Sequence, residues 1–176
     1  MKSRPANEGS VACNVAKTFA LGIPFWSLIL FFCPALIFQA ELRLGIQHPA
    51  NYGLKLVSVV AFCLSGALGI SSGIALAVYG KGTPLPLDCT RCMVVVGPYG
   101  YVRNPMAIGI IMQGVAVGGY LASPVTVLYS LCGVALWNRF ARRWEERDLE
   151  ERFGEEFRRY RSAARCWIPN FRRYRP

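Results

Sequence analysis

The stretch "GPYGYVRNPM", residues 97–106, stands between two long segments that lack charged side chains. Its glycines and prolines favour turns and interrupt helices. Asn104 is a favoured helix N-cap, and Pro105 is a favoured first helical residue. We therefore predict a turn that ends at Asn104 and a helix that begins at Pro105, at the mouth of an apolar segment.

Charge is distributed along the chain as it is in membrane proteins. The 176 residues are 53% hydrophobic and 17% charged, with a mean hydropathy of +0.31, whereas soluble domains contain about 25% charged residues. Most of the acidic and arginine residues follow Arg139. A net charge of +10 beside apolar segments is typical of chain ends that face anionic lipid. We expect membrane lipids, and no nucleic acid, as partners.

Apolar segments predict four membrane spans. Residues 18–40 and 56–80 are each long enough to cross a bilayer as a helix. The uncharged segment 104–138 is too long for one helix and contains Ser123-Pro124 near its middle, so we predict a hairpin of spans at about 106–121 and 125–140. The fold class is then all-α: a single domain over 1–176, built as a polytopic membrane helix bundle of four transmembrane helices.

Proline, glycine and other small residues predict kinks and close helix contacts within these spans. Pro24 and Pro34 are expected to kink the first span, which membrane helices tolerate. Small residues at four-residue spacing recur in the second and third spans and allow a neighbouring helix to approach closely. These residues are Ser65, Gly69, Gly73, Ala77, Gly114 and Gly118.

The basic residues orient the predicted bundle. They precede the first span, occupy the 81–103 connection and follow the last span, whereas the 41–55 connection has few. By the positive-inside rule, both termini are predicted to be cytoplasmic. After the fourth span, apolar side chains recur every three or four residues over 146–160, which predicts a cytoplasmic amphipathic helix. Gly154 is a candidate end for that helix.

A helical hairpin brings two polar clusters together, because the predicted third and fourth spans join at their far ends. The 97–106 stretch then lies beside residues 142–146. Each cluster alone has a simple structural interpretation, as a helix start or as arginines paired with glutamates. Cys89 and Cys92 form a lone CxxC pair far from His48, which favours two free thiols over a metal or redox centre, so no metal site is predicted.

The order and spacing of several short motifs are specific. "GTPLPLDCTRCMVVVGPYGYVRNPM" at 82–106 is followed by an uncharged hairpin and by "EERDLEERFGEEFRRYRSAARCWIP" at 145–169. Over roughly 82–170 the chain resembles the isoprenylcysteine carboxyl methyltransferase and phospholipid methyltransferase superfamily. The matching residues are Gly97-Pro98-Tyr99, Arg103-Asn104-Pro105-Met106, Glu145-Glu146, Leu149, Phe153-Gly154, Phe157, Tyr160 and Ile168-Pro169.

The resemblance implies an integral membrane methyltransferase that uses S-adenosylmethionine and has its cofactor-binding region at about 82–170. It implies that Arg142 and Glu145 are catalytic, with Arg142 facing the substrate. The implied cofactor-binding residues are Met93, Val94, Tyr99, Arg103, Asn104, Pro105, Met106, Glu145 and Glu146. The acceptor would be lipophilic: an isoprenylcysteine carboxylate, a lipid amine or another membrane-soluble molecule.

Asn104 and Ala107 depart from the family pattern. Asn104 stands where the eukaryotic prenylcysteine enzymes carry histidine, and Ala107 stands where many members carry tyrosine. The identity of the acceptor therefore does not carry over. Two alternatives stay open on the sequence: an NADPH-dependent membrane reductase related to sterol reductases, and a non-enzymatic four-span membrane protein. The oligomeric state is also open.

Overall fold

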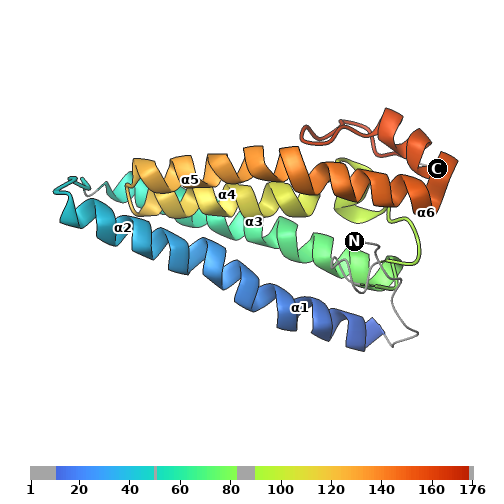
Figure 1. Cartoon of the computed structure of the whole chain (residues 1–176), viewed down its shortest axis with the longest axis horizontal. Helices are drawn as coiled ribbons and strands as arrows, with labels where there is room; N and C mark the ends of the chain where they lie inside the picture. Colours follow the sequence, from blue (N-terminus) through green and yellow to red (C-terminus); the bar gives the residue numbers. More distant parts are fainter. Residues whose placement is uncertain (1–10, 50, 83–89, 175–176) are drawn as a thin grey trace.

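The computed structural model describes residues 11–49, 51–82 and 90–174, and within these ranges it is helical with no strand (Figure 1). Two π-helical turns each join two α-helices into one long rod. The elements are α1 (Val11–Ser27), η1 (Leu28–Phe32), α2 (Cys33–Arg43), α3 (Tyr52–Tyr79), η2 (Gly97–Gly100), α4 (Pro105–Tyr120), α5 (Pro124–Leu136), η3 (Trp137–Ala141) and α6 (Arg142–Ala163).

The predicted spans coincide with these helices. Residues 18–40 lie within α1 to α2. Residues 56–80 begin four residues after the start of α3 and end one residue beyond it. Residues 106–121 follow α4 to within one residue, and 125–140 cover most of α5 and η3. Two helices, Ala12–Arg43 and Tyr52–Tyr79, are long and apolar enough to cross a membrane, while Pro105–Tyr120 is a shorter apolar helix. Four full crossings therefore remain a prediction.

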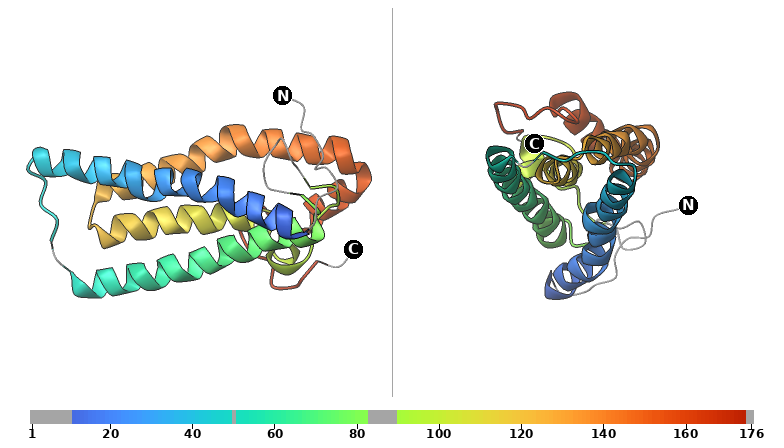
Figure 2. Two further views of the ribbon diagram at one scale, coloured as in Figure 1. Left: turned by 90° about the horizontal axis from the view of Figure 1, so that it is seen from below. Right: turned by 90° about the vertical axis from the view of Figure 1, so that its left-hand side faces the viewer.

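The rods run side by side along the long axis of the molecule (Figures 1 and 2). One end carries the α2–α3 connection and the α4–α5 turn. The opposite end carries the start of α1, the end of α3, η2, the start of α4 and α6 (Figure 1). We call this second end the polar end, because it carries the arginine-rich part of the chain. The described parts of the basic segments that were predicted to share one side of the membrane therefore lie at one end of the bundle.

Large side chains face outward and small ones face inward. Leu56 and Leu64 of α3 are 67% and 68% exposed, whereas Ser65, Ser72 and Ala77 of the same helix are buried. Large contiguous apolar surface is rare on soluble monomers, and small buried residues are typical of helix contacts inside membranes. Together with the two long apolar helices, this distribution indicates a membrane protein.

Glycines allow α3 and α4 to approach closely. A Cβ atom on Gly109 of α4 would lie 2.9 Å from the carbonyl oxygen of Ser65 and 3.0 Å from the amide nitrogen of Gly69, both on α3. A Cβ on Gly114 would lie 2.6 Å from Ser130 Oγ of α5. The close packing that the small residues predict is therefore confirmed, and it fixes α4 between α3 and α5.

Irregular backbone lies close to the predicted helix breakers. Pro24 lies inside α1, and η1 follows it and ends just before Pro34. The predicted interruption at Gly154 is confirmed, because two helical stretches meet at a kink there within α6. Gly154 adopts φ +52° and ψ −120°, which glycine tolerates because it has no Cβ. The helix kinks there and resumes, so that Phe157 and Tyr160 are buried.

Candidate functional site

A cavity of about 740 Å³ lies between α1, α4, α5 and α6 and reaches the polar end of the bundle. Among the described residues, its charged lining consists of Arg103, Glu145, Asp148 and Arg152, and the remaining lining is mostly apolar. The lining includes Thr18, Phe25, Trp26, Ile29, Thr90, Met93, Val94, Tyr99, Asn104, Met106, Ala107, Ile110, Tyr129, Leu136, Trp137 and Trp144. The cavity thus joins a charged region to an apolar one.

The charged side chains that α6 contributes share one helical face. Glu145, Asp148 and Arg152 are spaced by three and four residues, which aligns them on a helix. Arg152 pairs with Asp148 at 2.7 Å and donates a hydrogen bond to the carbonyl oxygen of Thr90 at 2.6 Å. This pair therefore fastens the segment before η2 to α6, next to Glu145.

Glu145 is the carboxylate that remains available to a ligand. It forms no hydrogen bond or ion pair with any residue in the described parts of the chain. Burial, together with the nearby Glu146 and Asp148, raises the pKa of Glu145 to about 7. A cation bound beside it would lower this pKa again, because it favours the ionised form. The cavity therefore has a site that favours positive charge.

Arg103 supplies the opposite charge. Its side chain is only 10% exposed, and its Nη1 lies 2.8 Å from Glu146 Oε1. The buried Nε of Arg103 has no hydrogen-bond partner. An unsatisfied buried donor is costly, and this one belongs to a residue that lines the cavity. An anionic ligand group would satisfy it.

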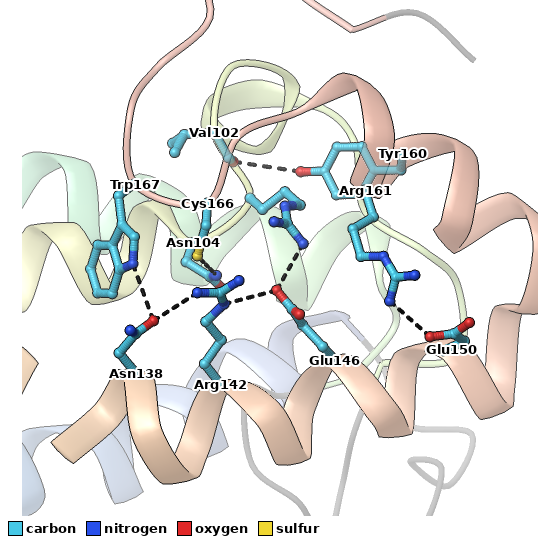
Figure 3. Close-up of polar contacts among 11 residues, drawn as sticks. Val102, Asn104, Asn138, Arg142, Glu146, Glu150, Tyr160, Arg161, Cys166 and Trp167 are labelled. Carbon is cyan, nitrogen blue, oxygen red and sulfur yellow. Dashed lines mark hydrogen bonds and ion pairs between the residues drawn. The ribbon is translucent and has the colours of Figure 1, made fainter. Parts of the chain in front are cut away.

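Glu146 holds Arg103 from outside the cavity lining. Its Oε1 also lies 3.0 Å from Arg142 Nε, and Arg142 donates a second hydrogen bond to Asn138 Oδ1 at 2.8 Å (Figure 3). The predicted meeting of the 97–106 stretch with residues 142–146 is confirmed by these contacts. Arg142 and Glu146 themselves do not line the cavity.

Hydrogen bonds from α6 and from the C-terminal part of the chain hold the turn over 97–104. Tyr160 Oη of α6 donates a hydrogen bond to the carbonyl oxygen of Tyr99 at 2.6 Å. The Asn104 side chain does not cap α4, although its position is that of the N-cap. Its Nδ2 instead donates to Cys166 Sγ at 3.1 Å (Figure 3). The predicted helix start, with Asn104 at the N-cap and Pro105 as the first helical residue, is confirmed. The side-chain capping bond is absent, because the tail of the chain accepts the Asn104 hydrogen bond instead.

Tyr99 itself faces the cavity as a neutral phenol. Burial raises its pKa far above the usual range, and the Glu145 carboxylate adds to this effect. Its ring lies in a small cluster with Ala75 and Val94. A rigid aromatic face beside a carboxylate can stack on a planar ligand or face a cation.

Substituting Tyr160 by phenylalanine should loosen this turn. The substitution leaves the buried Tyr99 carbonyl without its donor, at a cost of about 1–3 kcal/mol. We expect a lower midpoint of thermal unfolding and faster amide exchange over 97–104. Tyr101→Phe is the matched control, because Tyr101 is exposed and its hydroxyl makes no hydrogen bond in the described residues. Equal midpoints for the two variants would contradict the role given to Tyr160.

The structure distributes the predicted site residues over two groups. The cavity is lined by Met93, Val94, Tyr99, Arg103, Asn104, Met106 and Glu145, but not by Pro105, Glu146 or Arg142. Pro105 is buried at the start of α4. Sequence reasoning missed Asp148 and Arg152, which helical spacing from Glu145 could have found. It also missed Thr18 and Trp26 of α1, for which the sequence carries no signal.

The cysteine pair is only partly described. Cys89 lies outside the described residues, whereas Cys92 is an exposed free thiol. In the described ranges, no three histidine, cysteine, aspartate or glutamate side chains gather as metal ligands.

Fold and site together define a helical membrane protein with a cavity that is charged at one end and apolar along the rest. The chain belongs to the phospholipid methyltransferase family, whose sequence profile matches residues 54–156. The match includes nearly all of α3, and so extends further toward the N-terminus than the motifs that suggested it. It makes the chain a membrane methyltransferase by family and does not favour the reductase alternative.

Similarity to a curated protein covers part of the chain. A protein of Bradyrhizobium diazoefficiens named methanethiol S-methyltransferase 1 is 36% identical over 76 residues. The match covers 40% of this chain and 24% of the relative. The chain therefore matches only about a quarter of that protein, whose substrate does not transfer with the likeness.

Proposed function

We propose that this chain is an S-adenosylmethionine-dependent methyltransferase that acts on an apolar acceptor entering from the membrane. The observation that carries the proposal is the placement of Glu145 and Arg103 in one cavity whose remaining lining is mostly apolar. A cofactor with both cationic and anionic groups requires such a pair. A membrane-soluble acceptor requires the apolar region.

The residues fit the cofactor group by group. A volume of about 740 Å³ lies within the range of ligand cavities, roughly 300–1,000 Å³. Glu145 would hold a cationic group, and the unpaired Nε of Arg103, with the amide groups at the start of α4, would hold the carboxylate. Met93, Val94 and the ring of Tyr99 would contact the adenine. When bound, the cofactor supplies an activated methyl group.

The protein then contributes orientation and exclusion of water. The apolar lining from α1, α4 and α5 keeps water from the acceptor, and fixed contacts at the polar end hold the reacting groups in line. Because Arg142 lies outside the lining and contacts Glu146, we assign it a positioning role through Glu146 and Arg103. Glu145 remains the catalytic residue of the proposal, because it lines the cavity.

The acceptor class follows from the apolar lining. Trp26, Ile29, Ile110 and Leu136 carry no charge, so the acceptor would present an apolar body with its nucleophilic atom toward the polar end. Candidates are a prenylated thiol acid, a lipid amine and a small thiol. The small thiol is included because the partial relative is named for methanethiol. We further propose that the polar end faces the cytoplasm and that α4 and α5 complete four spans.

Binding of labelled S-adenosylmethionine to the detergent-purified protein tests the cofactor. We expect saturable binding that is lost when Glu145→Ala and Tyr99→Ala are combined. Glu151→Ala combined with Tyr101→Ala is the matched control, because both side chains are exposed. NADPH binding without S-adenosylmethionine binding would favour the reductase over the methyltransferase. Unchanged S-adenosylmethionine binding in the Glu145 and Tyr99 double variant would show that the cofactor does not bind in this cavity.

A methyl-transfer assay identifies the acceptor. The purified protein is incubated with labelled cofactor and either a membrane lipid extract or short alkyl thiols, and the labelled product is identified by its mass. Product from one class and not the other assigns the acceptor. Cofactor binding without transfer to either class would exclude both candidates.

A further inference from the structure

The tail of the chain folds back onto the turn that lines the cavity. We call residues 164–174 the C-terminal strap; it follows α6 and is drawn in red in Figure 1. The amide of Arg103 donates to the carbonyl oxygen of Arg165 at 3.0 Å. In return, the amides of Asn170 and Tyr174 donate to the carbonyl oxygens of Tyr101 and Gly100, each at 2.8 Å. The strap and the turn are therefore fixed to one another by backbone hydrogen bonds.

Side chains reinforce this attachment. The ring of Tyr174 packs on Tyr160 with centroids 5.3 Å apart, and Tyr160 in turn holds the Tyr99 carbonyl. A Cβ atom on Gly100 would lie 2.9 Å from Cγ of Arg173, so the stem of Arg173 rests on the backbone of the turn. Whatever restrains the strap therefore also restrains the turn.

A tryptophan pair holds the strap beside the C-terminal end of α5. Trp167 of the strap packs edge-on against Trp137, with centroids 5.3 Å apart. Its Nε1 donates to Asn138 Oδ1 at 3.4 Å. Trp137 follows the apolar α5 directly and precedes Arg139 by two residues. Tryptophan at such a boundary is typical of the membrane–water interface.

The outward side of the strap combines apolar and basic side chains. Phe171 is fully exposed, and Ile168 is 59% exposed. Arg165, Arg172 and Arg173 are exposed, and none of them lies within 4 Å of a carboxylate in the part of the chain that the structure describes.

Three arginines of α6 differ from those of the strap. Arg152 pairs with Asp148, and Arg158 and Arg161 both pair with Glu150, each within 2.8 Å. These three arginines therefore have acidic partners on their own helix. The strap carries no acid, so its positive charge remains available to an external anion.

We propose that the strap binds anionic phospholipid at the membrane surface, with its arginines on the headgroup phosphates and Phe171 at the acyl boundary. Basic residues at this level are attracted by anionic leaflets, and exposed aromatic side chains suit the same depth. Lipid binding would hold the strap against the 97–104 turn and so order one wall of the cavity. This inference does not depend on the reaction that the cavity performs.

Amide exchange of the full chain in nanodiscs tests the proposal. The lipid is phosphatidylcholine alone or phosphatidylcholine mixed with phosphatidylglycerol. We expect the strap amides, Asn170 and Tyr174 among them, to exchange about tenfold more slowly with the anionic lipid. High salt should reduce the difference, because it screens charges at the surface.

Two double variants carry the same loss of charge. Arg165→Gln with Arg172→Gln should abolish the lipid dependence, and it leaves the packed stem of Arg173 in place. Arg158→Gln with Arg159→Gln on α6 should retain it. Unchanged exchange of α3 amides shows that each variant is folded.

Three results would overturn the proposal. Exchange could be equal in the two lipid mixtures, or the strap variant could keep the wild-type dependence. Soluble glycerophosphate could also protect the strap equally in neutral nanodiscs, which would assign a site for free phosphate instead of lipid. Because exchange is read without cofactor, none of these results bears on the methyltransferase assignment.

Discussion

Replacement of Glu145 by glutamine is expected to weaken S-adenosylmethionine binding by about 10- to 100-fold near neutral pH, as the loss of a charged hydrogen-bonding group does. Glutamine has nearly the same shape, so the cavity itself should persist. What is lost is the negative charge that would hold a cationic group of the cofactor. Transfer activity at limiting cofactor should fall by at least the same factor.

The pH dependence of binding should change in the same variant. The free protein holds Glu145 with a pKa of about 7, and a bound cation favours the ionised carboxylate. Binding therefore releases a proton below that pKa, and the affinity of the wild-type protein should fall up to tenfold for each pH unit below it. Above it the affinity should be constant. The glutamine variant should bind the cofactor weakly, and its affinity should not change with pH over the same range.

Equilibrium binding across this pH range checks both expectations. Glu151→Gln is the matched control, since it removes a carboxylate from an exposed position of the same helix. Thermal unfolding separates binding from folding. A carboxyl whose folded pKa lies above its unfolded value destabilises the folded state once it ionises, so the ligand-free Glu145→Gln protein should unfold at the same or a higher temperature near neutral pH. If the Glu145→Gln protein kept the wild-type pH dependence of cofactor affinity, the role assigned to Glu145 would be contradicted.

Local patterns predicted most of the helices and the meeting of the two polar clusters. Charge-free length and helical spacing depend on near neighbours in the sequence, and they located α3 and α4 to within a few residues. The hairpin required only that two adjacent helices pack antiparallel. Its consequence, the contact of Arg103 with Glu146 at 2.8 Å, is present in the structure.

The orientation of individual side chains was beyond the same reasoning. Glu145 and Glu146 are adjacent in sequence but point about 100° apart on a helix, as 3.6 residues per turn requires. One lines the cavity and the other holds Arg103 from behind. The angle of α1 against α5, which brings Thr18 and Trp26 to the cavity, depends on tertiary packing alone.

Substituting Gly109 by alanine is expected to separate α3 from α4. The added Cβ would lie 2.9 Å from the Ser65 carbonyl oxygen and 3.0 Å from the Gly69 amide nitrogen. These are backbone atoms, so no side-chain rotation relieves the contact, and the helices must move apart. Overpacking of this kind costs about 1–3 kcal/mol. The midpoint of thermal unfolding should fall by several degrees.

The displacement should also reach the cavity, because α4 carries Met106 and follows directly from the 97–104 turn. We therefore expect weaker cofactor binding together with the lower midpoint. Gly69→Ala is the matched control, since a Cβ at Gly69 meets no atom within 4 Å, although its backbone forms the same contact. If glycine at 109 served only flexibility, both substitutions would cost about the same, because glycine is equally unfavourable in both helices. If only Gly109→Ala lowers the unfolding midpoint and weakens cofactor binding, the cause is the short distance between the α3 and α4 backbones. Backbone flexibility would not explain that result.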